Sequence, residues 1–306
     1  VDPDQKRNEV DITYIVEEKS SDQIQLQGGW GAGRIVGQLG LTFNNFSTKN
    51  VFKLDKWTPL PSGDGQRLSL SASSNGIYYQ NYSISFTEPW LGGKKPNSLT
   101  ISLSKSISSN GQNGDMRQAI EITSLSLGLG KRLKYPDDYF TLYNGVTFQQ
   151  YKLINSQSFF SFSDGFSNNI SYTINVGRNS VDQLIFPRRG SNFLLSLKLT
   201  PPYSSFDNID DYSSLTDQEK YSWIEYYKWK FKSSWFSSFT EKLVINTRVE
   251  MGLLGAYNND IGVAPFERFY VGGDGMSGMG YQFDGRELIS LRGYSNNSIS
   301  PQTGAT

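Results

Sequence analysis

The sequence predicts an all-β chain that forms a transmembrane antiparallel β-barrel, and three observations support this fold class. From Asp22 onward, apolar side chains alternate with small polar ones, which is the period-two pattern of a sheet with two different faces. The alternating segments reach the roughly 9–11 residues that a tilted crossing of the hydrocarbon layer requires. The connections between them alternate between short and long, which is typical of bacterial outer-membrane barrels.

The alternation predicts eleven strands. Leu68 and Leu70 alternate with serines, for example, and Lys228, Lys230 and Lys232 alternate with aromatic residues. We expect these lysines to point into water. The predicted strands cover residues 22–33, 34–45, 66–74, 77–87, 98–107, 118–132, 139–154, 166–180, 190–200, 221–236 and 242–257.

The lengths of the connections predict on which side of the membrane each one lies. If the chain enters from the periplasm, the connections after even-numbered strands should be short. The connections at 133–138, 181–189 and 237–241 are short, and those at 155–165 and 201–220 are longer and polar. Residues 46–65 break this rule, because they fall on the expected periplasmic side and are about twenty residues long. We interpret them as an insertion.

Eleven strands followed by a loop do not make a closed barrel. An open sheet edge in hydrocarbon leaves a row of unpaired amide and carbonyl groups, and each of them costs several kcal/mol, so only closed barrels span a membrane. We therefore expect further strands that this chain does not contain.

The composition excludes several classes of function. The 306 residues include no cysteine and no histidine, which removes disulfides, thiolate nucleophiles, imidazole bases and ordinary zinc sites. We expect a protein that is not an enzyme and that holds no cofactor and no metal. Lys and Arg number 29, as do Asp and Glu, so there is no excess positive charge for nucleic acid. The sequence contains no run of 18 apolar residues, so we expect no transmembrane helix. Val1 is followed directly by charged residues and not by a signal peptide, as we expect of a mature or truncated start.

The most informative motif lies after the last predicted strand. Two pieces, Pro-Phe-Glu-Arg-Phe-Tyr-Val-Gly-Gly-Asp-Gly at 265–275 and Leu-Arg-Gly-Tyr at 291–294, resemble the signature loop of the BamA family of outer-membrane protein assembly factors. The turns Glu-Pro-Trp-Leu-Gly-Gly at 88–93 and Phe-Pro-Arg-Arg-Gly at 186–190 are also similar to that family. The loop residues that carry the resemblance are Phe266, Glu267, Arg268, Phe269, Tyr270, Gly272, Gly273, Leu291, Arg292, Gly293 and Tyr294.

The resemblance implies a domain organisation. The family has a barrel of 16 strands with the motif loop after the eleventh, preceded by periplasmic POTRA modules. Residues 1–20 would then be the end of the last POTRA module and a linker, with its final strand at 10–17, and residues 21–306 would be the first eleven barrel strands and the loop. The alternative for 10–17 is a strand of the main sheet.

The resemblance also implies that the loop folds into the lumen, where Arg292 makes polar contacts with later strands. The fixed fork of a guanidinium suits this role, and Gly293 would allow the tight backbone. The alternative is an Arg292 on a solvated outer loop. Glu267 and Arg268 are adjacent, so we expect each to have its own partner. About fifteen residues separate the two pieces, where the family has only a few.

The first predicted strand is a second candidate site. Its glycines weaken strand order and side-chain packing. The resemblance implies that this strand meets the last one in a weak seam, the lateral gate, where an incoming strand pairs with its backbone. The alternative is that the glycines only permit a tight bend. The candidate residues are Gln23, Ile24, Gln25, Leu26, Gln27, Gly28, Gly29, Trp30 and Gly31.

The function implied by the resemblance is that of an insertase in the bacterial outer membrane, which folds nascent β-barrel proteins by templating their strands. Its partners would be nascent outer-membrane proteins, accessory assembly lipoproteins and outer-membrane lipid. The alternative is a two-partner secretion channel that exports polypeptide through a related barrel. A passive porin or a phospholipase barrel is disfavoured, the latter because a Ser-His pair needs a histidine.

Overall fold

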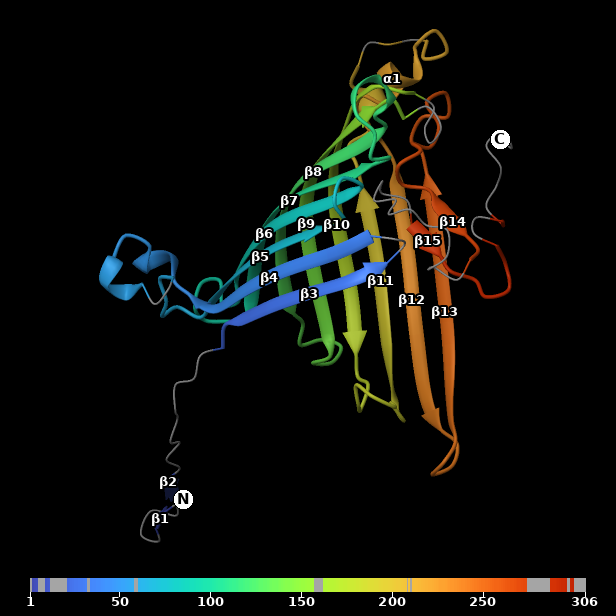
Figure 1. Ribbon diagram of the computed structural model, residues 1–306. Helices are drawn as coiled ribbons and strands as arrows, with labels where there is room; N and C mark the ends of the chain where they lie inside the picture. The colour runs from blue at the N-terminus through green and yellow to red at the C-terminus, as the bar shows by residue number, and fades with distance from the viewer. Residues whose placement is uncertain are drawn as a thin grey trace.

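The computed structural model describes residues 2–4, 9–11, 21–31, 34–57, 60–156, 162–207, 209, 211–273, 287–295 and 298–299. One curved antiparallel sheet of eleven strands dominates them, and each strand pairs with its neighbours in sequence (Figure 1). The eleven strands that the alternation predicts are thereby confirmed. They are β3 (Gln23–Gly31), β4 (Arg34–Phe46), β5 (Gln66–Ser74), β6 (Tyr79–Glu88), β7 (Asn97–Ser109), β8 (Ala119–Arg132), β9 (Phe140–Ile154), β10 (Gly165–Asn179), β11 (Gly190–Leu199), β12 (Tyr227–Ser238) and β13 (Val244–Gly255).

The remaining elements are short. Near the N-terminus, β1 (Asp2–Asp4) pairs with β2 (Glu9–Asp11), and after the sheet β14 (Phe269–Val271) pairs with β15 (Glu287–Ile289). The helices are η1 (Thr48–Asn50), η2 (Leu54–Lys56), η3 (Gly114–Met116), η4 (Tyr203–Ser205) and α1 (Asp217–Lys220). In the described part of the chain, none of the helices has the length and apolarity to cross a membrane. The strand expected over 10–17 extends beyond Asp11 into residues that lie outside the described ranges.

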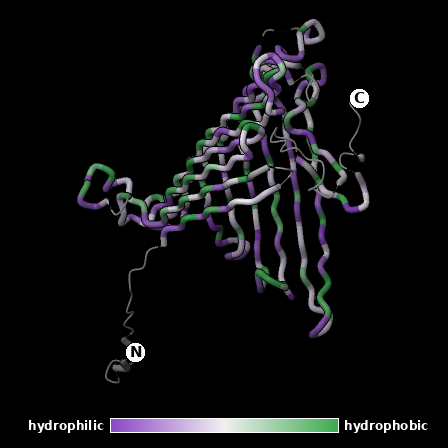
Figure 2. Tube along the Cα trace, in the orientation of Figure 1, coloured by the Kyte–Doolittle hydropathy of each residue, from purple (hydrophilic) through white to green (hydrophobic). Residues whose placement is uncertain are grey.

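Apolar and polar residues alternate along the strands, as the tube colours in Figure 2 show, so the two faces of the sheet differ in polarity. On the outer face, apolar side chains such as Leu103, Leu127 and Trp229 are between 42% and 48% exposed. A water-soluble protein rarely exposes so continuous an apolar surface, but the lipid-facing side of a transmembrane barrel does. The inner face carries hydroxyl groups that pair between neighbouring strands. These pairs include Ser71–Ser83 at 2.8 Å, Ser85–Ser102 at 3.0 Å and Ser126–Thr147 at 3.1 Å.

Antiparallel pairing places successive connections at opposite ends of the sheet. Residues 47–65 therefore lie at the end where the chain enters β3. They form a compact unit, because Ser47 donates from its backbone N to Pro61 O at 2.9 Å and from Oγ to Asp64 at 2.6 Å. Since the strand count is correct, a miscounted strand does not explain this long connection, and its interpretation as an insertion stays a prediction.

The boundary of one predicted strand is wrong. The sequence pattern predicts a strand from residue 221, but β12 begins at Tyr227. The preceding residues pair with β10 instead, where Asn168 N donates to Ser222 O and Ile224 N donates to Asn168 O, both at 2.8 Å. They can do so because the pairing of β10 with β11 begins only at Tyr172.

A hydrophobic cluster packs against the inner, polar face of the sheet. It joins β8 and β9 to two segments that fold back over them, residues 222–226 and 264–266. Its buried members are Ile122, Tyr151, Leu153, Phe162, Ile224, Tyr226, Ala264 and Phe266. The chain after β13 is therefore packed against the inner wall of the sheet.

Candidate functional site

Phe266 attaches the segment after β13 to the inner wall. Its side chain is fully buried, and its ring stacks on Tyr151 of β9 with centroids 4.5 Å apart and planes 29° apart. Phe162 meets the same ring edge-on at 6.3 Å. Aromatic pairs of this kind contribute roughly 0.5–1.5 kcal/mol beyond the area that they bury. The motif phenylalanine is thus a main hydrophobic contact of the returning loop.

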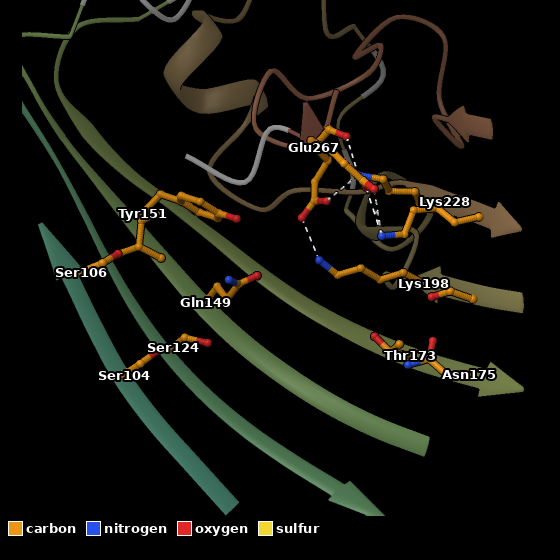
Figure 3. Close-up of a pocket in the computed structure, with 14 residues that line it drawn as sticks. Ser104, Ser106, Ser124, Gln149, Tyr151, Thr173, Asn175, Lys198, Lys228 and Glu267 are labelled. Atoms are coloured by element: carbon orange, nitrogen blue, oxygen red, sulfur yellow. Dashed lines mark hydrogen bonds and ion pairs between the residues drawn. The ribbon is translucent and has the colours of Figure 1, made fainter. Parts of the chain in front are cut away.

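Glu267 connects the loop to two further strands (Figure 3). Its carboxylate is 4% exposed, and Oε1 accepts from Lys198 Nζ at 2.8 Å and from the Tyr226 hydroxyl at 3.0 Å. Lys228 Nζ lies 3.4 Å from Oε2 and donates to the Glu267 backbone carbonyl at 2.9 Å. One carboxylate is therefore bound by two lysines and a tyrosine, which offsets the cost of burying its charge.

The expectation that Lys228 points into water is wrong. Lys228 is 4% exposed, because the loop covers it and supplies Glu267 as its partner. Lys230 stays about one third exposed and pairs with Glu287 at 3.1 Å, and Lys232 pairs with Glu250 at the more open end of the series. The three lysines face the polar interior, as the alternation predicts. The burial of Lys228, however, depends on the segment around Glu267, about forty residues later in the sequence.

A polar cavity of about 650 Å³ lies beside this cluster. Lys198, Lys228 and Glu267 border it on one side, and hydroxyl and amide side chains from β7 to β10 border it on the other (Figure 3). These labelled side chains are Ser104, Ser106, Ser124, Gln149, Thr173 and Asn175. Such a lining can hydrogen-bond water or extended backbone, and the chain has no histidine or cysteine with which to activate a nucleophile here.

Glu287 extends the ion-pair network and makes it sensitive to pH. Burial alone would raise its pKa, but the hydrogen bond from Lys230 and the charges of Lys230 and Lys228 outweigh it and hold the pKa below the ordinary 4.5. A carboxylate with a lowered pKa contributes stability above its unfolded pKa, and this contribution is lost as the pH falls through the folded value.

We expect Glu287→Gln to destabilise the protein by about 1 kcal/mol at neutral pH, and the difference from the natural protein to shrink as the pH falls below 4.5. Thermal unfolding of both proteins in detergent, from neutral pH to below pH 4.5, would measure this difference in stability. Glu241→Gln, at an exposed turn, is the control. A deficit that is the same at every pH would contradict the ion-pair explanation.

The two pieces of the motif are joined in space. Phe269–Val271 forms a parallel pair with Glu287–Ile289, and an isolated antiparallel bridge links Gly273 with Leu291. Leu291 N donates to Gly273 O, and Gly273 N donates to Tyr294 O, both at 2.9 Å. The residues that separate the pieces in sequence therefore do not separate them in the fold. Residues 274–286 between them lie outside the described ranges.

Glycine is required at this junction. Gly272 has a φ of 117°, and a Cβ there would lie 2.5 Å from the carbonyl oxygen of Ser295. Gly293 has a φ of 90°, but a Cβ there would meet open space. A substitution at either position would be strained, because L side chains rarely adopt this conformation, and at Gly272 it would also clash with backbone.

We expect Gly272→Ala to open the junction more than Gly293→Ala does. The strain is on the order of 1–3 kcal/mol at either site, and the clash at Gly272 adds to it. Limited proteolysis of the full-length protein would show faster cleavage within residues 268–295 in Gly272→Ala. Equal cleavage of the two variants would mean that the close approach to Ser295 has no energetic effect.

The remaining loop residues have separate environments. Arg268 donates from Nη2 to Val263 O at 3.0 Å, so it does not share a partner with its neighbour Glu267. The ring of Phe269 lies 4.5 Å from Lys228 Nζ and fills the space beside Gly252, where a Cβ would come within 2.8 Å of it. Tyr270 lies in β14. Leu291, Arg292, Gly293 and Tyr294 are exposed, and the contact of Arg292 with later strands stays a prediction.

The first strand has a different character. All of Gln23–Trp30 is exposed, including Ile24 at 78%, Leu26 at 81% and Trp30 at 74%. Within the described sheet, β3 is an edge strand that pairs only with β4. Gly28 faces Gly37 across this pair, and no atom lies within 4 Å of a Cβ built at either position. The centre of β3 is therefore joined to β4 by backbone hydrogen bonds with little side-chain packing. Its role as a gate stays a prediction.

Sequence reasoning identified the loop and missed its partners. Tyr151, Lys198, Tyr226 and Glu287 do not belong to any motif. One signal was available: lysines on the polar face of a predicted strand require an acidic partner if they are covered, and Glu267 is the acid of the motif. The distance between them could not be read from the sequence.

Comparison with known proteins agrees with this architecture. A family model described as the Omp85 superfamily domain matches residues 62–306. The chain is similar to the crystal structure of BamA from Haemophilus ducreyi lacking POTRA domains 1–3, with a TM-score of 0.63 and 21% identity over 93% of this chain and 48% of that one. CdiB from Escherichia coli matches with a TM-score of 0.47 and 14% identity over 90% of this chain and 49% of that one. No curated protein sequence matches significantly. The chain thus spans about half the length of these two solved chains.

Proposed function

The chain belongs to the Omp85 superfamily, since the family model matches well over half of its residues, and on that premise we propose that the protein is an outer-membrane insertase. It is a membrane β-barrel protein of the bacterial outer membrane. In the proposed function it folds nascent outer-membrane proteins and inserts them by offering a strand edge at a lateral gate. POTRA modules would precede the barrel, and accessory lipoproteins of a Bam-type complex would be its partners.

The observation that carries this proposal is the character of β3. At its centre Gly28 faces Gly37 of β4, and no atom lies within 4 Å of a Cβ built at either position, so little side-chain packing joins the two strands there. An edge strand of this kind can accept another strand, because main-chain hydrogen bonds form with any extended segment. Exposed Ile24 and Leu26 would then lie beside the apolar side chains of the incoming strand in lipid.

The returning loop supports the same proposal. Phe266 and Glu267 connect β9, β11 and β12 from the inside, through Tyr151, Lys198 and Lys228. For β3, by contrast, the centre of its contact with β4 is the facing pair Gly28 and Gly37, where no side chain packs. Elements with fewer packed contacts open at a lower cost in free energy. The loop would therefore hold one wall of the barrel fixed while the seam at β3 opens.

No covalent step is part of this mechanism. The free energy for insertion would come from backbone hydrogen bonds that replace those to water and from transfer of apolar side chains into lipid. Strand pairing makes few demands on side-chain identity, so one edge could serve many substrates. Gln23, Gln25 and Gln27 alternate with the apolar residues of β3, and they would face the polar interior.

Depletion of the full-length protein in its own cell tests the proposal. We expect a general loss of folded outer-membrane β-barrel proteins, measured by their heat-modifiable migration on gels. Loss of a single secreted protein, with other barrels intact, would instead indicate a two-partner secretion channel and would overturn the insertase.

A further inference from the structure

The connections at the end of the sheet where the chain enters share a composition that strand pairing does not require. Antiparallel order places residues 47–65, 89–96, 133–139, 180–189 and 239–243 at this entry end. Each of the five connections exposes at least one large apolar side chain. The most exposed of these are Phe52 at 96%, Leu54 at 80%, Tyr135 at 85%, Leu184 at 97%, Ile185 at 74%, Phe186 at 86% and Phe239 at 74%.

Basic side chains accompany these apolar residues. The five entry-end connections contain nine Lys and Arg against six Asp and Glu. Several of the basic residues lie within three positions of an exposed apolar one, such as Lys53 beside Phe52 and Arg189 near Phe186. The connections between strands at the opposite end contain two Lys and Arg against eight Asp and Glu. In this chain, the two sets of connections therefore differ in the sign of their net charge.

We infer that these five entry-end connections form a lipid-binding rim, in which the apolar side chains enter the membrane interface and the basic ones bind the phosphate groups of anionic phospholipids. This inference rests on the membrane-barrel fold and not on the proposed insertase function. Aromatic and apolar groups favour the boundary between headgroups and hydrocarbon, and lysine and arginine next to a bilayer are attracted to anionic lipid. Long basic side chains can lie along apolar surface while their charges reach the phosphates.

The distribution of these residues favours a bilayer over a protein partner. The pattern recurs in every connection along the entry end, from the insertion near β4 to the turn between β12 and β13. A docked protein would contact one continuous patch, whereas a bilayer meets all strand ends. The rim also continues the apolar outer face, where Leu103, Leu127 and Trp229 are exposed.

The insertion presents the largest share of the rim. Its own hydrogen bonds fix its shape, including Asn50 Nδ2 to Ser62 O at 2.9 Å and Trp57 Nε1 to Val51 O at 3.2 Å. Phe52 and Leu54 are left exposed by this fold, together with Lys53. A rigid unit that exposes apolar groups at a strand end is well suited to anchor the adjacent strands β4 and β5 at a fixed depth.

Depth-dependent quenching tests the rim in the full-length protein. Because this chain has no cysteine, Leu54→Cys or Leu184→Cys in it can be labelled with an environment-sensitive dye, with Ser213→Cys at the acidic end as the control. The protein is reconstituted into vesicles of phosphatidylcholine mixed equally with phosphatidylglycerol, containing a lipid spin-labelled near the headgroup. We expect blue-shifted emission and several-fold stronger quenching at residues 54 and 184 than at 213. Equal, water-like emission at all three would overturn the rim.

A charge variant separates anionic lipid from other occupants. We expect the triple change Lys94→Gln, Lys95→Gln and Arg189→Gln to lower the phosphatidylglycerol that remains bound after detergent extraction at least twofold by native mass spectrometry. Lys220→Gln, at the opposite end, should leave it unchanged. Unchanged lipid in the triple variant would contradict the inference. In the dye experiment, emission at residues 54 and 184 that shifts to the blue only after an accessory protein is added would assign this surface to that protein. This outcome would also contradict the lipid-binding rim.

Discussion

Glu267→Gln should release the returning loop from the inner wall. The substitution keeps the size of the side chain but removes the charge that compensates Lys198 and the buried Lys228. Removing one partner of a buried ion pair costs about 3–5 kcal/mol when the other charge is left without compensation. Glu287 lies 3.4 Å from Lys228 Nζ and still compensates part of this charge, so we expect a loss toward the lower end of that range. We expect rapid tryptic cleavage after Arg268 in the full-length protein in detergent, and a lower midpoint of denaturation.

Two further variants distinguish the ion pair from a general loss of packing. Glu250→Gln removes the partner of Lys232, but both side chains are about half exposed, so the loss should stay within about 1 kcal/mol. Adding Lys228→Met to Glu267→Gln removes the buried charge that has lost its Glu267 partner and should recover part of the stability. If Glu267→Gln were no less stable than Glu250→Gln, the buried cluster would not hold the loop.

Covalent closure of the seam at β3 should stop substrate maturation. A cysteine at Gln25, paired with a cysteine at the facing position of the last strand of the full-length barrel, would be crosslinked with a short thiol-specific reagent. The proposed gate works by freeing the β3 backbone for strand addition, so the locked protein should leave folded outer-membrane proteins near the level of depleted cells. This chain contributes no other cysteine to the reaction.

The matched control is a crosslink between strands that stay paired. Ser83 on β6 and Ser104 on β7 are direct cross-strand partners within the sheet. Cysteines at these positions, treated with the same reagent, should leave maturation unchanged. Full activity of the protein locked at Gln25 would rule out opening of the seam as a step in insertion.

The positions of the strands could be predicted because alternation is a local property. Each strand residue faces either lipid or the polar interior, so period two persists over the length of every strand. The start of β12 could not be predicted in this way. The residues before Tyr227 have strand-like composition, but Ser222 and Ile224 pair with Asn168. That pairing depends on where β11 ends, which is a property of the assembled sheet.

The loop shows the same limit more clearly. Its motif identified Phe266 and Glu267 as important, but the burial of Lys228 follows from a contact across about forty residues of sequence. The junction of the two motif pieces is formed largely by backbone hydrogen bonds of Gly273 and Leu291, which leave no side-chain pattern. Sequence reasoning therefore found which residues carry the loop but could not find what they contact.

The junction between Gly273 and Leu291 has a consequence for how this protein can vary. The hydrogen-bonded bridge between these two residues holds the ends of the intervening loop together. The free-energy cost of closing this loop is therefore already met by the fold. Doubling the length of a closed loop costs only about 0.6 kcal/mol. An insertion between Gly273 and Glu287 should therefore cost little in loop-closure free energy and leave the Glu267 cluster intact.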